Sequence, residues 1–105
     1  MSEKEINDRL EMIMTSSEIS RIHISKDSQD LHIKADLHGL KCSEAKQFIS
    51  NLICLVREQF YLEIIHGYNH GTAIKNMLWF DYSNSRVIDK WIDIFNPGLT
   101  HMSIA

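Results

Sequence analysis

Asp36 and His38 are the residues whose types and spacing best suit acid–base chemistry. Residues two apart in an extended backbone point to the same side, so Asp36 can orient the His38 imidazole and raise its basicity, as for a general base. His66, in a second His-Gly pair, supplies another titratable ring. In phosphodiester cleavage, one histidine would deprotonate the nucleophile and another would protonate the leaving oxygen. The predicted catalytic residues are therefore Asp36, His38 and His66.

The two His-Gly pairs also have features of an anion-binding site. Each pair lies just before a predicted helix, and the free N–H groups at a helix N-terminus attract phosphate. Gly67 and Gly71 let the backbone approach a ligand closely, and Asn69 between them tolerates left-handed geometry. Tyr68, in the same turn, is a candidate for stacking on a base. The residues predicted to bind nucleic acid or phosphate are Gly39, Lys41, Gly67, Tyr68, Asn69, His70, Gly71, Thr72 and Lys75.

An α/β fold is predicted to position these turns. Apolar periodicity predicts strands over residues 31–37, 61–65, 86–95 and 100–104, and helices from Ser43 to about Gln59 and from Thr72 to Tyr82. The order β-α-β-α-β-β indicates an α+β two-layer sandwich with a mixed sheet. We expect parallel pairing across both strand–helix–strand passages, a central strand at 61–65 and a final antiparallel hairpin. Ligands bind beyond the carboxyl ends of such strands, where both His-Gly pairs lie.

Residues 1–30 are predicted to form an N-terminal helical extension, and residues 31–105 the main domain. The helix over residues 3–14 has one apolar stripe, formed by Ile6, Leu10, Ile13 and Met14. Residues 19–24 are short and ambiguous, and a polar turn follows them. We expect a monomer or a weak homodimer through the N-terminal helix; docking of a partner on that helix would make the chain an interaction adaptor.

Composition narrows the classes of function. A formal net charge of −3 argues against nucleic-acid binding by bulk positive charge. A local basic patch is still permitted, drawn from Lys41, Lys46, Lys75, Arg86 and Lys90. The N-terminus lacks a signal-peptide pattern, no apolar run is long enough to span a bilayer, and the two cysteines form no CxxC pair. These features predict a cytoplasmic protein with reduced thiols and no membrane partner.

Three segments resemble the Smr (small MutS-related) domain family. Residues 35–40 (ADLHGL), followed by Glu44-Ala45, are similar to the "LDLHG…EA" opening of that domain. Residues 65–71 (IHGYNHG) are similar to its "IHGxG" motif, and residues 98–104 (GLTHMSI) to its closing "GaTxVxL" strand. The three motifs occur in the family's order across residues 31–105.

The resemblance implies a fold like the C-terminal domain of bacterial translation initiation factor three. It also implies DNA nicking or endonucleolytic RNA cleavage, with mRNA on stalled ribosomes as the substrate of some members. Members that cut such mRNA carry an Asp-x-His motif, here Asp36 and His38, and their second motif, here His66, Gly67 and Asn69, helps to hold substrate. We therefore expect a Smr-type endonuclease, with RNA favoured over DNA and with no cofactor.

Two departures from the family pattern concern substrate contacts. Asn69 replaces the usual second glycine of the second motif, and Phe95-Asn96 replaces the paired glycines before the last strand. The alternative function is a non-catalytic nucleic-acid- or ribosome-binding module. Purely structural roles also stay open at individual positions: His66 could connect its turn to a neighbouring element by hydrogen bonds, and His70 could be a solvent-exposed loop residue. A metal site from Asp36, His38, His66 and His70 has no supporting ligand spacing, so none is predicted; His101 could face the site.

Overall fold

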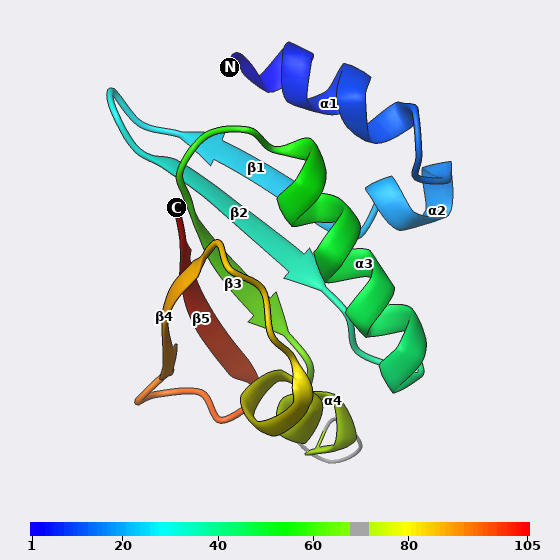
Figure 1. Ribbon diagram of the computed structural model, residues 1–105, viewed down its shortest axis with the longest axis vertical. Coiled ribbons are helices and arrows are strands. Elements are labelled where there is room, and N and C mark those ends of the chain that lie inside the picture. Colours follow the sequence, from blue (N-terminus) through cyan, green and yellow to red (C-terminus); the bar gives the residue numbers. More distant parts are fainter. Residues whose placement is uncertain (68–71) are drawn as a thin grey trace.

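The computed structural model describes residues 1–67 and 72–105 (Figure 1). The strands are β1 (Ile22–Lys26), β2 (Leu31–Asp36), β3 (Phe60–Ile65), β4 (Val87–Ile92) and β5 (Leu99–Ile104). The helices are α1 (Glu3–Glu11), α2 (Ser16–Ile19), α3 (Cys42–Leu55) and α4 (Thr72–Asn76), with a π-helical turn, η1 (Met77–Asp81), directly after α4. Tyr68, Asn69, His70 and Gly71 therefore lie outside the described residues.

All five strands form one mixed sheet in the order β1-β2-β3-β5-β4. The pair β2–β3 is parallel, and the other three pairs are antiparallel. The predicted α+β two-layer fold, the central position of β3 and the β4–β5 hairpin are confirmed. From β2 onward, the elements also follow the predicted order.

The predicted pairing of β3 with β4 is wrong. Both strands are antiparallel to β5, so they run in the same direction, but β5 lies between them. The burial patterns explain this order. β5 buries every second residue (Thr100, Met102 and Ile104), whereas no residue of β4 is fully buried. The strand with a continuous buried face takes the inner position, and the more exposed β4 takes the edge.

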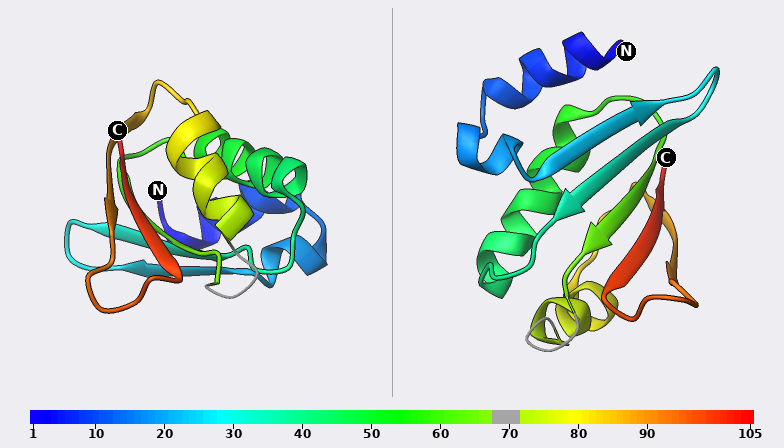
Figure 2. Two further views of the ribbon diagram at one scale, coloured as in Figure 1. Left: turned by 90° about the horizontal axis from the view of Figure 1, so that it is seen from below. Right: turned by 180° about the vertical axis from the view of Figure 1, so that it is seen from behind.

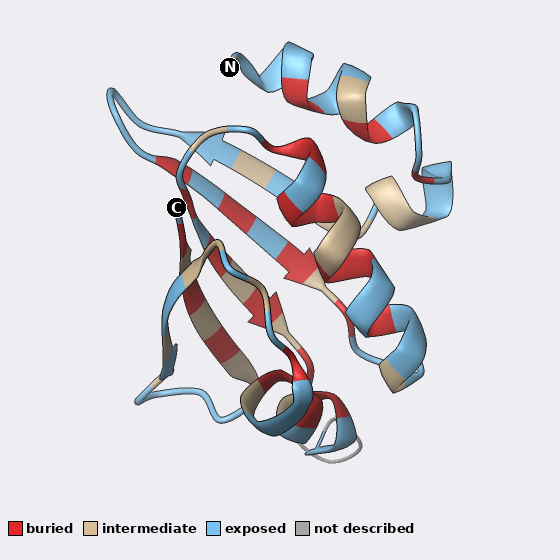
Figure 3. Cartoon of the chain, viewed as in Figure 1, coloured by how far each residue is buried: buried red, intermediate tan, exposed pale blue. Residues whose placement is uncertain are grey.

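One face of the sheet packs against α1, α3 and α4 (Figure 2). Along β2, the alternate residues Leu31, Ile33 and Ala35 are buried, and α3 buries Phe48 and Leu52 among others (Figure 3). Each buried leucine, isoleucine or phenylalanine side chain among them contributes roughly 1.5–3 kcal/mol. The opposite face bears no helix of the described residues. We call it the open face; it carries His32, Lys34, Tyr61, Glu63 and His101.

The N-terminal segment is part of this core and of the sheet. Ile6 and Leu10 of α1 are fully buried, and the Arg9 side chain donates to the Leu55 carbonyl (2.7 Å) at the end of α3. Of the segment left ambiguous at residues 19–24, residues 22–24 belong to β1, which pairs antiparallel with β2. α1 ends at Glu11, and of the two residues of the predicted helical stripe that lie beyond it, Ile13 is 56% exposed whereas Met14 is buried.

Helix α3 differs from its predicted bounds at both ends. Its N-cap is Lys41 rather than near Ser43, because the Lys41 N–H donates to Glu44 Oε1 (2.9 Å). It ends at Leu55, before the predicted Gln59, and the Arg86 guanidinium donates to carbonyl groups in its last turn and just after it. These are the carbonyls of Ile53, Val56 (2.7 Å) and Glu58 (3.1 Å). A cation at the negative end of a helix is favourable, so Arg86 fixes where α3 stops.

Candidate active site at the Asp36–His38 turn

The two His-Gly turns lie side by side at the carboxyl ends of β2 and β3. The Leu37 N–H donates to the Ile65 carbonyl (2.8 Å), which continues the parallel pairing into the turns. Gly39 and Gly67 have φ values of 81° and 83°, a region that favours glycine. A Cβ built on Gly67 would lie 3.8 Å from the His38 Cβ. The two His-Gly pairs therefore lie next to each other in space.

His38 and Asp36 form a hydrogen-bonded pair at the end of β2. His38 Nδ1 bonds to Asp36 Oδ1, and the same oxygen accepts the His38 backbone N–H (3.2 Å). An aspartate at Nδ1 favours the tautomer with the proton on that nitrogen and leaves Nε2 able to accept one. The His38 side chain is 66% exposed. The pair is therefore accessible to a large substrate and has the geometry of an oriented general base.

Arg21, which the sequence analysis did not select, holds the backbone of this turn. Its Nη1 donates to the carbonyls of Asp36 (3.0 Å) and His38 (3.2 Å), and its own carbonyl accepts the Asp36 N–H (2.9 Å). Arg21 lies just before β1. The signal that could have found it is the polar turn at residues 26–30, which would have predicted a hairpin between β1 and β2.

A pocket of about 480 Å³ lies beside the turn, between α2 and the start of α3. Arg21 and Leu40 line it on the side of the turn, and Glu44 and Phe48 line it from α3. Phe48 gives the pocket an apolar wall, while Arg21 and Glu44 supply opposite charges.

His66 does not have the geometry predicted for a catalytic residue. It is buried, with 1% of its surface exposed, and both ring nitrogens are hydrogen-bonded inside the protein. Nδ1 donates to the Gly67 carbonyl (2.8 Å), and Nε2 accepts from the Thr100 hydroxyl (2.8 Å). The Thr100 oxygen in turn accepts the indole N–H of Trp79 (3.3 Å). His66 thus connects its turn to β5 through hydrogen bonds, which is the structural role that the sequence left open for it.

Burial also favours the neutral form of His66. Desolvation lowers the pKa of His66, and the positive charge of Lys75 lowers it further, against the opposing effect of the Gly67 carbonyl. A neutral imidazole with one N–H matches the hydrogen-bond directions, because Nε2 must accept from Thr100. A buried, neutral and fully bonded ring cannot exchange protons with a substrate in this conformation.

The backbone N–H groups of the second His-Gly pair also have partners inside the protein. The N–H groups of His66 and Gly67 both donate to the Gly98 carbonyl (3.0 and 3.2 Å). A Cβ on Gly98 would lie 3.3 Å from the Gly67 carbonyl carbon, so any larger residue at position 98 would crowd this contact. The Gly67 amide therefore already has a partner, and the predicted phosphate contact of Gly67 stays a prediction.

The predicted cations separate into structural and exposed groups. Arg86 holds the end of α3, and Lys90 Nζ donates to the carbonyls of Leu78 (2.8 Å) and Tyr82 (3.2 Å). Lys41 is exposed and follows the Gly39 turn, while Lys75 is half-buried near His66. Arg86 and Lys90 are thus engaged in structural contacts, and among the described residues the predicted basic patch keeps only its other lysines. Thr72, the remaining predicted contact, is the exposed first residue of α4.

His101 lies on the open face rather than at the His38 turn. Its Nε2 donates to Asp93 Oδ2 (2.9 Å), and the Trp91 ring stacks on it at a centroid distance of 5.6 Å. His101 is the β5 partner of Glu63, whereas the turn begins beyond Ile65. The structure therefore contains a second Asp–His pair, which sequence reasoning missed.

Comparisons of the chain with protein-family models, with curated proteins and with solved structures find no match. The Smr resemblance therefore depends on the three motifs quoted above. Within residues 1–67 and 72–105, no helix has the length and apolar character needed to cross a membrane.

Proposed function

We propose that this chain is a nucleic-acid endonuclease of the Smr type, with RNA as its substrate and His38 as its acid–base group. The observation that carries the proposal is the hydrogen bond between Asp36 and an exposed His38. The motif resemblance supports the same assignment, because Asp36 and His38 form its Asp-x-His element. With His66 buried, the proposed chemistry uses one histidine rather than two.

A single histidine favours RNA over DNA. His38 Nε2 removes the proton from a ribose 2′-hydroxyl, the 2′-oxygen attacks the adjacent phosphorus, and the bond from phosphorus to the 5′-oxygen breaks. The imidazolium then returns its proton to the departing 5′-oxygen, so the products are a 2′,3′-cyclic phosphate and a 5′-hydroxyl. The nucleophile is part of the substrate and needs no separate binding site. DNA lacks this hydroxyl and would require a positioned water molecule.

Asp36 and Arg21 have positioning roles in this scheme. Asp36 fixes the ring orientation and stabilises the imidazolium formed during the reaction. Arg21 holds the carbonyls on either side of Leu37, and so keeps the turn in place. Lys41 and Lys75 are the proposed phosphate contacts, since they lie next to the two turns and carry positive charge.

The test is cleavage of end-labelled single-stranded RNA, nicking of circular DNA and cleavage of mRNA on stalled ribosomes. We expect His38→Ala and Asp36→Asn to lose RNA cleavage by roughly 10²-fold or more. His32→Ala is the matched control: His32 is also an exposed histidine near an aspartate, at 3.8 Å from Asp27, but it lies within β2 and away from the turn. If wild type and His38→Ala are equally inactive on every substrate, the endonuclease proposal fails.

A second candidate function is a non-catalytic nucleic-acid- or ribosome-binding module. The burial of His66 favours it, because the described part of the paired turns then offers one exposed acid–base residue. This candidate requires salt-dependent RNA binding that survives Asp36→Ala and weakens with Lys75→Ala. Binding without cleavage, under conditions where His38→Ala changes nothing, would select it over the endonuclease.

A further inference from the structure

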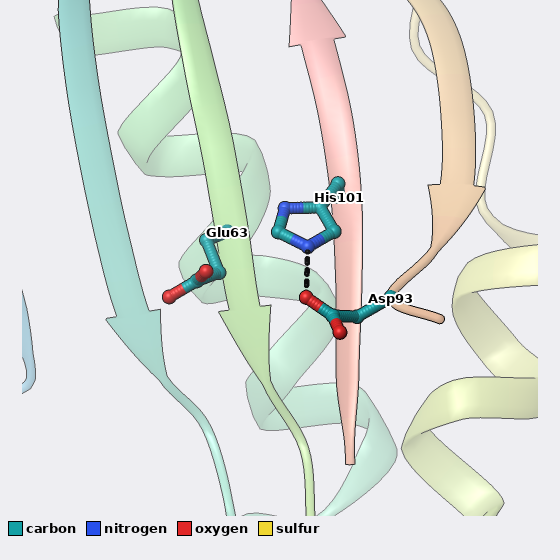
Figure 4. Close-up of side chains that lie close together, drawn as sticks. All are labelled: Glu63, Asp93 and His101. Carbon is teal, nitrogen blue, oxygen red and sulfur yellow. Dashed lines mark hydrogen bonds and ion pairs between the residues drawn. The ribbon is translucent and has the colours of Figure 1, made fainter. Parts of the chain in front are cut away.

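Glu63, Asp93 and His101 form a cluster of metal-ligating groups on the open face (Figure 4). Glu63 and His101 are direct partners across the β3–β5 pair, and Asp93 directly follows β4. Their ligand atoms all lie within 4.8 Å of one another. The set shares no residue with the Asp36–His38 turn, and it differs from the metal ligands considered in the sequence.

We propose that this cluster binds a divalent transition-metal ion of the zinc class. It offers one imidazole nitrogen and two carboxylates, the mixed donor set that Zn²⁺ accepts. The imidazole favours zinc, cobalt or nickel over magnesium and calcium, which prefer sites made of oxygen alone. The proposal stands on these three residues alone and does not depend on the endonuclease assignment.

The distances require only small movements. Two ligands bound to zinc at about 2.0–2.2 Å in a tetrahedral arrangement lie about 3.4 Å apart. His101 Nε2 and Asp93 Oδ2 are 2.9 Å apart, so they must separate by about half an ångström when the metal replaces the shared proton. Glu63 has to move toward them, which rotation of its long side chain allows. The bound His101 then carries its single proton on Nδ1.

Neighbouring groups orient the ligands before any metal arrives. Asp93 Oδ1 accepts the backbone N–H groups of Phe95 (2.9 Å) and Asn96 (3.0 Å), which directs Oδ2 toward His101. The Trp91 ring stacks on the imidazole at an interplanar angle of 14°. Hydrogen bonds and packing behind metal ligands commonly raise affinity by fixing their orientation. These contacts are the feature that distinguishes the cluster from a chance group of surface residues.

Lys34 competes only weakly with a metal ion for the Glu63 carboxylate. Lys34 Nζ lies 3.8 Å from Glu63 Oε2, but its side chain is 60% exposed, so the ion pair can be exchanged for water at little cost. The ligands themselves are half-buried, with His101 at 21% and Asp93 at 23% exposure. Partial burial strengthens the attraction between two carboxylates and a divalent cation. Three protein ligands leave at least one coordination position for water or another ligand.

Zinc binding to the full chain can be measured by isothermal titration calorimetry, and cobalt binding by its visible absorption. We expect one tight equivalent of Zn²⁺ that His101→Gln and Glu63→Gln each weaken at least tenfold. The chain has six histidines, so His32→Gln and His38→Gln are the matched controls and should leave the affinity unchanged. Glu63→Gln is the more informative variant, because it keeps the side-chain size and leaves the Asp93 loop contacts intact.

Ligand identity is read independently of activity by nitrogen-15 spectra of the histidine rings. Zinc should shift the Nε2 resonance that disappears in His101→Gln, while circular dichroism confirms that each variant is folded. The proposal is overturned if no saturable binding occurs at micromolar to tens of micromolar Zn²⁺. It is equally overturned if the folded Glu63→Gln and His101→Gln variants bind zinc as the wild type does.

Discussion

Replacing Thr100 with valine should destabilise the protein, because it removes the hydroxyl on which His66 depends. Thr100 is fully buried; its hydroxyl group donates to His66 Nε2 (2.8 Å), and its oxygen accepts from the indole N–H of Trp79 (3.3 Å). Valine has nearly the same shape, so the substitution leaves no large cavity. Instead, the buried Nε2 of His66 loses its hydrogen-bond partner, which lowers the free energy of unfolding by about 1–3 kcal/mol.

The size of the effect follows from how far each partner is buried. His66 is 1% exposed and cannot recover the lost bond from water, whereas the half-buried Trp79 can do so in part. We therefore expect Thr100→Val to lower the free energy of unfolding by about 2 kcal/mol. With a urea m-value of roughly 2 kcal/mol per molar, the transition midpoint should fall by about 1 M at an unchanged m-value.

Thr100→Ser separates this explanation from simple loss of packing. Serine keeps the hydroxyl and removes one methyl group, so it should cost only about 1 kcal/mol. The reasoning is refuted if the valine variant is as stable as the wild type, or if serine is as damaging as valine. Either result would show that the hydrogen-bond chain through Thr100 does not hold the second turn.

Three further predictions concern the same turns and the end of α3. Burial lowers the pKa of His66, so the unfolded state binds a proton at a higher pH than the folded state does. The free energy of unfolding of the wild type should therefore fall as the pH drops below about 6.5, by at most about 1.4 kcal/mol per pH unit. Urea unfolding between pH 5 and 8 should show this slope in the wild type and not in His66→Gln. Arg86→Leu should lower the free energy of unfolding, measured by thermal denaturation, by about 2–3 kcal/mol. Arg86→Lys should restore only part of this loss, because a single ammonium group cannot reach the separate carbonyl groups that the guanidinium contacts. Full rescue by lysine would contradict this explanation. Gly39→Ala should cost about 1 kcal/mol from its φ of 81° alone, since an added Cβ meets nothing within 4 Å, and a neutral effect would show that the turn relaxes.

The sequence predicts the elements whose patterns are local and misses those that depend on distant partners. The alternation of Leu31, Ile33 and Ala35 and the helical spacing around Phe48 are properties of short segments, and both elements are found in the structure. β1 has no such pattern, because it is an edge strand with mostly exposed residues. Its position, and with it the role of Arg21, appears only when β2 is placed beside it.

The same limit applies to side-chain partners across the sheet. The pairing of His101 with Asp93 depends on the β4–β5 register, which includes a bulge between Val87 and Asp89. The structural use of Arg86 depends on where α3 ends, about thirty residues earlier in the chain. Counting basic residues therefore overestimated the positive charge available to attract nucleic acid. Some of these side chains donate hydrogen bonds to backbone carbonyl groups, and the sequence does not show which carbonyl groups need such a donor.

The difference between the two His-Gly pairs follows from their register. Asp36 and Ile65 are direct partners in the parallel β2–β3 pair, so His66 is level with Leu37 rather than with His38. Successive residues point to opposite faces, and both Leu37 and His66 are buried. His38 comes one residue later, beyond the end of the strand, where the turn carries it into solvent. The two identical dipeptides are thus offset by one position, and that offset makes His66 a structural tie while His38 keeps an accessible ring.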